Sequence, residues 1–333
     1  MAFSLHHSWV WDFWLAHQDG VHHLYYLHAP QGLGDPGLRH RNAVIGHAVS
    51  GDLRVWEDQG TILRPGPQGT FDSSATWTGC TVEDDDGVWR LFYTGSVFAS
   101  GDSPVNTERI GVATAQGPGA TDWRKNPLPQ VSADPRWYET LADGTWKEEA
   151  CRDPWVFRRP GEQHWTMYFT ARAAPDQAAR EAAVRGSAAP DLGVIGMATS
   201  ADLETWEVGP PASASGSGFL HLEVPQFVDF GGRQAVLFSC GGDHLAAWRR
   251  EQGDVGGIWA APVSRDGRID VLDAYLLLDQ RFYSGRAVES PEGGWGLMAF
   301  HHPAPGEAFR GGITDPFPLS WGPDGRLHVS LPG

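Results

Sequence analysis

Short apolar, aromatic-rich runs recur along this chain at nearly even distances. The five runs read LYYLHA, LFYTGS, MYFTAR, VLFSCG and LMAFHH, and they begin at Leu24, Leu91, Met167, Val236 and Leu297. Their starts lie 67, 76, 69 and 61 residues apart. Runs of this length, rich in aromatic residues, are typical of buried β-strands. A strand that returns at such a spacing predicts a repeated structural unit.

A second strand pattern and a closing tryptophan follow each of the first three runs. The second pattern reads IGHAVS, IGVATA and IGMATS and begins at Ile45, Ile110 and Ile195. The closing tryptophans are Trp56, Trp123 and Trp206. Because these three side chains occupy equivalent places in their units, we expect them to pack between neighbouring units rather than to bind a ligand.

Turn-forming pairs separate the strands and set the size of the unit. They are Asp19-Gly20, Asp86-Gly87, Pro160-Gly161, Gly231-Gly232 and Gly293-Gly294, each just ahead of an aromatic run. A repeat of about 60 to 75 residues with four short strands and such turns is typical of a propeller blade. The sequence therefore predicts an all-β fold, a five-bladed β-propeller of four-stranded antiparallel blades, as a single domain over residues 1–333.

Two segments depart from the strand pattern. Residues 173–191 are rich in Ala, Arg, Gln and Glu, and this composition favours a helical excursion from the third unit. Residues 97–109 are rich in Gly, Ser, Pro and Asn, and we expect a long loop there in the second unit.

Three acids lie in nearly the same register ahead of the aromatic runs. Asp12, Asp153 and Glu223 precede their runs by 12, 14 and 13 residues. The corresponding places in the second and fifth units hold Thr78 and Tyr283. The innermost strands of a propeller line its central funnel. We therefore expect the three carboxylates to face one another at one end of that funnel.

Such a trio suits the cleavage of a glycosidic bond. That reaction needs one carboxylic acid to protonate the leaving oxygen and a carboxylate to attack or to activate water, and a third acid can orient the sugar. Glu223 lies between apolar residues, an environment expected to raise its pKa and keep a proton available. Asp153 follows Arg152, whose cation is expected to favour the ionised carboxylate.

Charge and composition narrow the classes of partner. The net charge of -16 and the pI near 5.2 argue against nucleic acid, since affinity for phosphates rests on Lys and Arg. No apolar run is long enough for a membrane helix, and the first residues lack the features of a secretion signal, so we expect a cytoplasmic protein that does not enter a membrane. Three distant cysteines and 14 histidines match no metal-ligand spacing, so we expect no metal and no cofactor.

At the three acids the sequence resembles glycoside hydrolase families 32 and 68, the invertase and levansucrase clan of five-bladed propellers. Residues 10–14, VWDFW, resemble the family 68 pattern VWDSW. Residues 77–80, WTGC, resemble the WSGS segment, and residues 152–154 carry the RDP motif. Residues 223–225, EVP, resemble the ECP and ERP motifs, and residues 282–284 resemble the tyrosine segment of the fifth blade.

The resemblance implies a role for each acid. Asp12 would be the nucleophile, Glu223 the acid/base and Asp153 the group that binds fructose hydroxyls and stabilises the transition state. The implied activity is a retaining cleavage of a β-fructofuranoside, sucrose or a short fructo-oligosaccharide, and transfer of the fructosyl group to a second sugar stays open. A retaining route requires the two reacting carboxyls to lie about 5 to 5.5 Å apart, against about 6.5 to 9.5 Å for inversion.

Several further residues are candidates for binding the saccharide. Trp11, Trp14 and Trp77 lie near the innermost strands, where aromatic faces can stack on a sugar. The other candidates are Asp72, Arg152, His244 and Tyr283. The resemblance implies that Tyr283 supports the nucleophile and that His244 or Arg249 takes the place of a fourth-blade arginine of family 68. The β-sandwich that follows the propeller in family 32 has no counterpart in this sequence.

Three other interpretations remain open. The first is an inverting arabinofuranosidase or xylosidase of the related family 43 propellers, which also carry acids on the first, third and fourth blades. The second is a propeller that binds sugar without turning it over, which the loss of both serines of the WSGS segment makes reasonable. The third is a protein-interaction scaffold, although such a surface has no need of three convergent acids.

Overall fold

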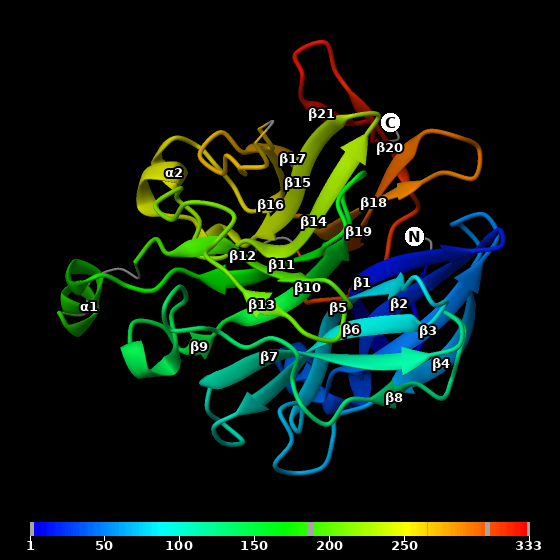
Figure 1. The fold of residues 1–333 in the computed structure, drawn as a ribbon, viewed down its shortest axis with the longest axis horizontal. Coiled ribbons are helices and arrows are strands. Elements are labelled where there is room, and N and C mark those ends of the chain that lie inside the picture. The colour runs from blue at the N-terminus through cyan, green and yellow to red at the C-terminus, as the bar shows by residue number, and fades with distance from the viewer. Residues whose placement is uncertain (1–2, 186–189, 265, 304–306, 332–333) are drawn as a thin grey trace.

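The repeated strands form five antiparallel sheets around a common axis (Figure 1). The computed structural model of the chain describes residues 3–185, 190–264, 266–303 and 307–331. Each sheet contains four strands in sequential order, and the second carries one extra short strand at its side. This architecture confirms the five-bladed propeller that the spacing of the aromatic runs predicts.

The strands of the first two blades have the following bounds. Blade one contains β1 (Ser8–Gln18), β2 (Val21–Pro30), β3 (Val44–Ser50) and β4 (Glu57–Leu63). Blade two contains β5 (Ala75–Glu83), β6 (Trp89–Phe98), β7 (Asn106–Ala115) and β8 (Arg124–Lys125). The extra strand is β9 (Glu148–Glu149), which pairs with β7 in parallel.

The other three blades repeat the same order. Blade three contains β10 (Cys151–Phe157), β11 (Trp165–Arg172), β12 (Gly193–Ser200) and β13 (Glu207–Val208). Blade four contains β14 (Glu223–Phe230), β15 (Arg233–Cys240), β16 (Gly257–Pro262) and β17 (Tyr275–Asp279). Blade five contains β18 (Phe282–Glu289), β19 (Trp295–His301), β20 (Phe317–Trp321) and β21 (Leu327–Val329).

The innermost strands close into a ring. Each of β1, β5, β10, β14 and β18 contacts the innermost strand of the next blade, and β18 returns to β1. Backbone hydrogen bonds between Phe3 and Ile313, and from Gly312 to Val10, join the last blade to the start of the chain. Closure matters for the site because side chains from all five innermost strands then point to one axis.

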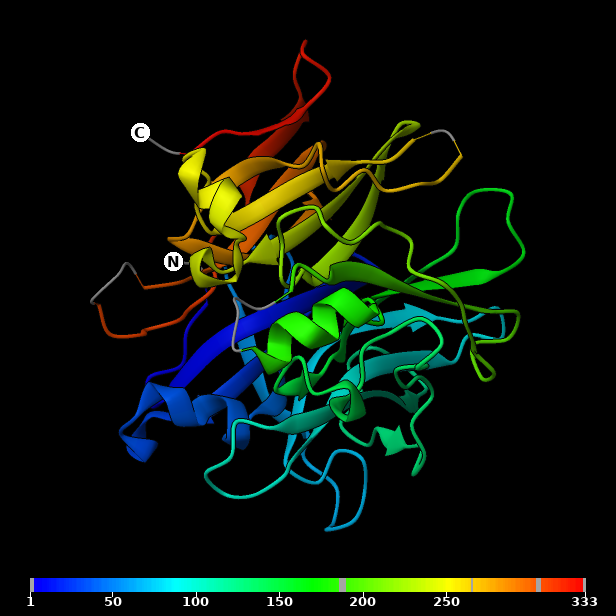
Figure 2. The same cartoon turned by 90° about the vertical axis from the view of Figure 1, so that its left-hand side faces the viewer.

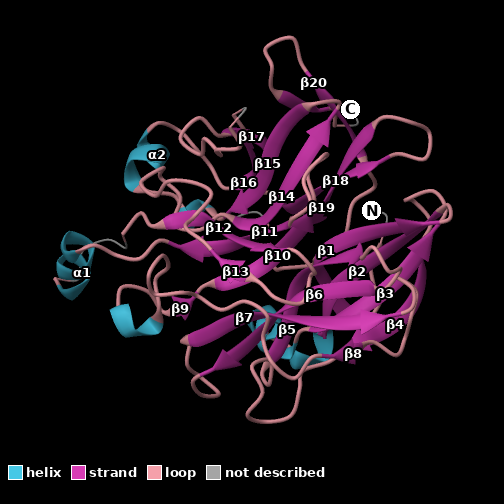
Figure 3. Cartoon of the chain, in the orientation of Figure 1, coloured by secondary structure: helices cyan, strands magenta, loops and turns pink. Residues whose placement is uncertain are grey.

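Helices are short and lie at the outside of the ring (Figures 2 and 3). The α-helices are α1 (Gln177–Val184) and α2 (Ala247–Glu251). The 3-10 turns are η1 (Gln31–Leu33), η2 (Pro36–Asn42), η3 (Leu141–Asp143) and η4 (Gly242–His244). Among the described residues, no helix has the length and apolar character needed to cross a membrane.

Two of the three tryptophans that close the units, Trp123 and Trp206, pack against the neighbouring blade, as their equivalent positions predict. Trp123 of blade two meets Tyr25 of blade one edge-on at 6.3 Å between ring centroids. Trp206 of blade three meets Phe92 of blade two in the same way at 5.6 Å. The bulky side chain of one blade therefore fills the gap beside the next.

In both segments that depart from the strand pattern, the predicted feature covers fewer residues than expected. The excursion from blade three contains a helix only over α1, begun by the Asp176 side chain that accepts from the Ala179 N–H (2.8 Å). Residues 186–189 of that excursion lie outside the described residues. The predicted loop of the second unit is present but shorter than residues 97–109, because β6 and β7 stay paired as far as Phe98 and Asn106 and leave residues 99–105 between them.

Candidate active site

Each innermost strand is interrupted at the same place by a shift of register. The shifts lie at Trp11/Phe13, Trp77/Gly79, Arg152/Trp155, Glu223/Gln226 and Tyr283/Arg286. Three non-glycine residues at these bulges, Asp153, Val224 and Ser284, have φ between 53° and 57°. Bulges with such backbone angles re-aim side chains and concentrate at functional sites. The matching register of the three acids is therefore a matching set of bulges.

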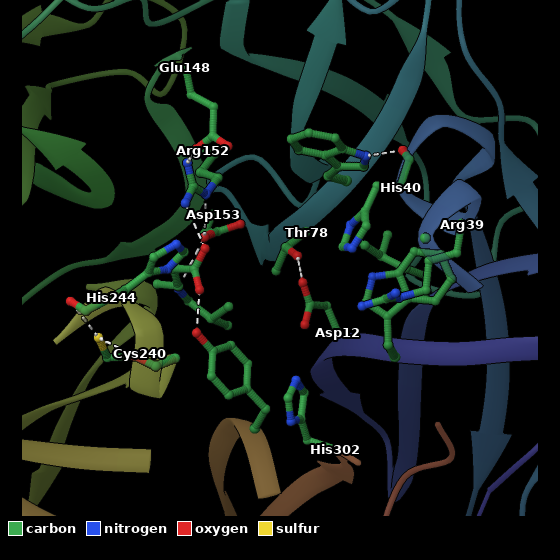
Figure 4. A pocket seen from close by; sticks show the side chains of 18 of the residues that line it. Asp12, Arg39, His40, Thr78, Glu148, Arg152, Asp153, Cys240, His244 and His302 are labelled. Carbon is green, nitrogen blue, oxygen red and sulfur yellow. Dashed lines mark hydrogen bonds and ion pairs between the residues drawn. The ribbon is translucent and has the colours of Figure 1, made fainter. Parts of the chain in front are cut away.

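The bulges open onto one cavity of about 960 Å³. Asp12, Asp153 and Glu223 all line it, from blades one, three and four. Figure 4 shows the Asp12 and Asp153 side chains extending into this space. The charge of Glu223 raises the pKa of Asp12, and the charges of Asp12 and Glu223 both raise the pKa of Asp153. The expectation that the acids converge is confirmed.

Asp12 is held by hydrogen bonds from two hydroxyl groups, and the charge of Arg39 acts on it from the cavity wall. Its Oδ2 accepts a hydrogen bond from Thr78 Oγ1 (2.7 Å), and its Oδ1 accepts one from Ser284 Oγ. Burial raises the pKa of Asp12 above its ordinary 3.8, and the two hydroxyl donors oppose that rise only in part. The carboxylate is thus oriented by hydrogen bonds that leave its charge largely uncompensated.

Asp153 sits deepest of the three acids in a network of backbone and hydroxyl groups. Its Oδ2 accepts from Thr170 Oγ1 (2.9 Å) and from the Val224 N–H (3.1 Å). Burial raises the pKa of Asp153 to about 6, against the opposing charge of Arg152. Arg152 does favour the ionised form of this carboxyl, as expected, but burial outweighs its effect, and the guanidinium also contacts another acid.

That other acid is Glu223. Arg152 Nη2 donates to Glu223 Oε1 at 2.6 Å, whereas its Nε lies 3.6 Å from Asp153 Oδ2. The Tyr283 hydroxyl donates to the second oxygen, Oε2. Burial would raise the pKa of Glu223, but Arg152 and the other neighbours outweigh it and hold the pKa below the ordinary 4.5. The expectation of a raised pKa from the apolar sequence neighbours is therefore wrong.

The predicted sugar-binding residues divide into two groups. Trp11, Trp77, Arg152, His244 and Tyr283 line the cavity. The Trp77 indole N–H donates to the His40 carbonyl (2.7 Å), so its ring is fixed at the wall. These five residues therefore share the cavity with the three acids.

Trp14 and Asp72 lie elsewhere, which corrects two of the predictions. Trp14 is fully buried between blades one and two, stacked on Tyr25 and donating from its indole to Thr81 Oγ1 (2.9 Å). Asp72 is buried in an ion pair with Lys125 and accepts from the Tyr93 hydroxyl (3.0 Å). Neither residue lines the cavity.

Several cavity residues carry no signal in the repeat. Glu108 and Glu148 stand beside Arg152, while Arg39, His40 and His302 line the wall on the side of Asp12 (Figure 4). Glu108 is the second residue after the start of β7, and the others come from loops, 3-10 turns or strand ends, where no register points to the axis. Within the part of the chain that the structure describes, no group of His, Cys, Asp and Glu is arranged to hold a metal ion.

Residues 14–253 match the N-terminal domain of glycosyl hydrolases family 32. The chain belongs to this family. The match to the family 32 domain includes Asp153 and Glu223 and begins two residues after Asp12.

Two curated relatives of the family 32 chain carry names that refer to fructosyl substrates. A sucrose-6-phosphate hydrolase of Zymomonas mobilis is 26% identical over 274 residues, which are 77% of this chain and 46% of the relative. A fructan 6-exohydrolase of Triticum aestivum is 27% identical over 184 residues, which are 47% of this chain and 29% of the relative. The chain thus spans less than half the length of these relatives.

Solved structures share the fold of the family 32 chain at low sequence identity. An inulosucrase from Halalkalicoccus jeotgali bound to kestose gives a TM-score of 0.75 at 22% identity, over 98% of this chain and 87% of that one. A Bombyx mori family 32 β-fructofuranosidase gives 0.70 at 19% identity, over 97% and 63%. A Bacillus subtilis levansucrase gives 0.69 at 16% identity, over 98% and 86%.

Proposed function

We propose that this protein is a retaining β-fructofuranosidase that releases fructose from sucrose or a short fructo-oligosaccharide. The observation that carries the proposal is the convergence of Asp12, Asp153 and Glu223 on one cavity, each from an equivalent bulge. The membership of family 32 supports it, as do relatives named for sucrose 6-phosphate and fructan. Kestose is bound in the inulosucrase structure and sucrose in a variant of the Bombyx mori enzyme.

In the proposed first step Asp12 forms a bond to the anomeric carbon of fructose. The glycosidic bond breaks, its electron pair stays on the leaving oxygen, and Glu223 gives that oxygen its proton. Asp153 binds hydroxyl groups of the fructose ring and orients it between the two reacting acids. In the second step Glu223 takes a proton from water, the water oxygen bonds to the anomeric carbon, and Asp12 leaves. Two displacements on the same carbon retain its configuration.

The resting hydrogen bonds of Glu223 suit the second step better than the first. Both of its oxygens accept a hydrogen bond, from Arg152 and from Tyr283, and this arrangement favours the ionised carboxylate. A hydroxyl group can donate or accept, and burial raises the pKa of Tyr283, so the Tyr283 hydroxyl keeps its proton. When Glu223 carries a proton, the Tyr283 oxygen can therefore accept a hydrogen bond from it. The leaving oxygen of the substrate then replaces the Tyr283 oxygen as the acceptor.

Incubation of the protein with sucrose, inulobiose and levanbiose tests the proposal. Free fructose is the expected product of at least one of them, and NMR of the first turnovers is expected to show the β-furanose form. The α-furanose form would contradict retention. Inverting turnover of a nitrophenyl arabinofuranoside, with no release of fructose, would favour the family 43 alternative. Saccharide binding without any turnover would favour the non-catalytic propeller.

A further inference from the structure

Glu108 is a buried acid to which the proposed reaction assigns no role. It lies on β7 of blade two, its side chain is 1% exposed, and it lines the cavity. Its Oε2 accepts a hydrogen bond from Arg152 Nη1 at 3.0 Å, and its Oε1 accepts one from Asn106 Nδ2 at 3.2 Å. Both oxygens of Glu108 are therefore engaged in fixing its position beside the guanidinium.

Arg152 joins Glu108 to the proposed acid/base. One end of the guanidinium, Nη1, contacts Glu108, and the other end, Nη2, donates to Glu223 Oε1 at 2.6 Å. The arginine is 8% exposed, so water screens these contacts weakly. The two carboxylates thus share one buried cation from opposite sides.

The remaining charged and titratable groups around this trio come from several elements. Arg152 also faces Glu148 of β9 (3.5 Å), Asp153 of β10 (3.6 Å) and His221 ahead of β14. Glu223 also faces His244 of η4, Tyr283 of β18 and Asp12 of β1. Glu108 is close to Glu148 and Asp153 as well as to Arg152. Within the described part of the chain, Glu108 is the acid other than Glu223 that makes a hydrogen bond to this arginine.

We propose that Glu108 is a positioning residue for the reaction proposed above: it holds the end of Arg152 opposite Glu223 and limits how strongly that cation stabilises the Glu223 carboxylate. The inference rests on the proposed role of Glu223 as acid/base. Without the Glu108 carboxylate, Arg152 has one hydrogen-bonded anion in place of two. Its full charge then stabilises ionised Glu223, and a smaller fraction of Glu223 carries the proton that the leaving oxygen needs.

Burial raises the pKa of Glu108 to about 8, against the opposing charge of Arg152. The negative charge of Glu108 therefore grows as the pH rises toward 8. Replacement by glutamine, which resembles the protonated acid, should matter little at low pH and most at the alkaline end of the activity range. A residue that merely fills space would give the same deficit at every pH.

The test compares Glu108→Gln with wild type across the pH range in which wild type releases fructose. On sucrose, kcat/KM is expected to fall by a factor that grows with pH to about tenfold, the effect of roughly one unit in the pKa of Glu223. On a nitrophenyl β-fructofuranoside, whose leaving group needs little protonation, the loss should stay within about twofold. If wild type turns over neither substrate, the proposed function fails before Glu108 is tested.

Two further variants separate the position of Glu108 from its charge alone. Glu108→Asp keeps the negative charge and should recover part of the activity on sucrose. Glu148→Gln removes a charge that lies 3.5 Å from the same nitrogen without a hydrogen bond, and it should give a smaller deficit than Glu108→Gln. An equal loss on both substrates at every pH, no loss in Glu108→Gln, or an equal deficit in Glu148→Gln would overturn the inference. Glu108→Asp provides the same substrate comparison if the glutamine variant does not fold.

Discussion

The two carboxylates proposed to react, Asp12 and Glu223, come from equivalent bulges yet lie in opposite electrostatic surroundings. Asp12 has two hydroxyl donors, from Thr78 and Ser284, and its pKa is raised by burial. Glu223 has a cation at 2.6 Å and a phenol, and these and its other neighbours together outweigh burial and lower its pKa. The repeat therefore fixes where an acid stands, whereas the neighbouring blades decide how firmly it holds a proton.

This contrast runs against the simplest assignment of roles. A nucleophile must be ionised and an acid must be protonated, but here the proposed nucleophile Asp12 is pushed toward its protonated form and the proposed acid Glu223 toward its ionised form. Because the two groups interact, the pH profile reports the pair rather than either residue alone. Variants that act on one member should nevertheless move one limb of the profile in a defined direction.

The largest expected effect is the loss of activity when Asp12 or Glu223 is replaced, and substrates with different leaving groups should distinguish the two residues. Asp12→Asn removes the attacking group and should lower kcat by about 10⁴-fold or more on sucrose and on a nitrophenyl β-fructofuranoside alike. Glu223→Gln should lose about 10² to 10⁴-fold on sucrose and much less in the first step on the nitrophenyl substrate. Steady-state and burst kinetics measure both. Similar behaviour of the two variants on the two substrates would contradict the assignment.

Replacement of Arg152, the cation that Glu108 and Glu223 share, should have the next largest effect. Arg152→Met leaves ionised Glu223 buried without its cation, so the free energy of unfolding at neutral pH should fall by about 3 to 5 kcal/mol. The deficit should shrink as the pH falls, because protonated carboxyls no longer need a cation. Urea denaturation at several pH values measures it. A deficit independent of pH would indicate lost packing rather than lost charge.

The hydroxyl donors of Asp12 allow a smaller and opposite shift. Ser284→Ala or Thr78→Val removes a hydrogen bond that lowers the pKa of Asp12, so this pKa should rise further. Ionised Asp12 then becomes scarcer at a given low pH, and the limb of the kcat/KM profile that reports ionisation of Asp12 should move to higher pH by about half a unit to one unit. Glu108→Gln should move the limb that reports protonation of Glu223 to lower pH. Movement of both limbs in one direction would show that the two acids do not titrate as described.

Much of the architecture follows from the sequence because it is periodic. The aromatic runs from Leu24 to Leu297 and the three acids repeat at fixed places, and a repeat carries its register from blade to blade. The environment of Glu223 does not follow, since Arg152 lies 71 positions away and its choice between Asp153 and Glu223 depends on how two blades face each other. Apolar sequence neighbours of Glu223 say nothing of that contact.

Trp14 shows a second limit of periodic patterns. An aromatic side chain on an innermost strand can face the cavity or pack against a neighbouring blade. Trp11 lines the cavity, whereas Trp14 of the same strand stacks on Tyr25 and donates to Thr81 of blade two. Asp72 precedes β5, outside any strand, and its ion pair with Lys125 arises from the end of the same blade. No spacing in the sequence indicates that pairing.

The smallest expected effect on catalysis concerns Asp72, which the structure places in an ion pair outside the cavity rather than among the sugar-binding residues. Burial would raise the pKa of Asp72, but Lys125 and the Thr70 and Tyr93 hydroxyls together hold it below 3.8. The ionised pair therefore contributes stability that is complete at neutral pH and is lost as the pH falls through the lowered pKa. Asp72→Asn should therefore cost about 2 kcal/mol of unfolding free energy near pH 7 and progressively less in acid. The KM and kcat for sucrose at 25 °C should stay within about twofold of wild type, because Asp72 does not line the cavity. A raised KM with unchanged stability would return Asp72 to the sugar-binding residues.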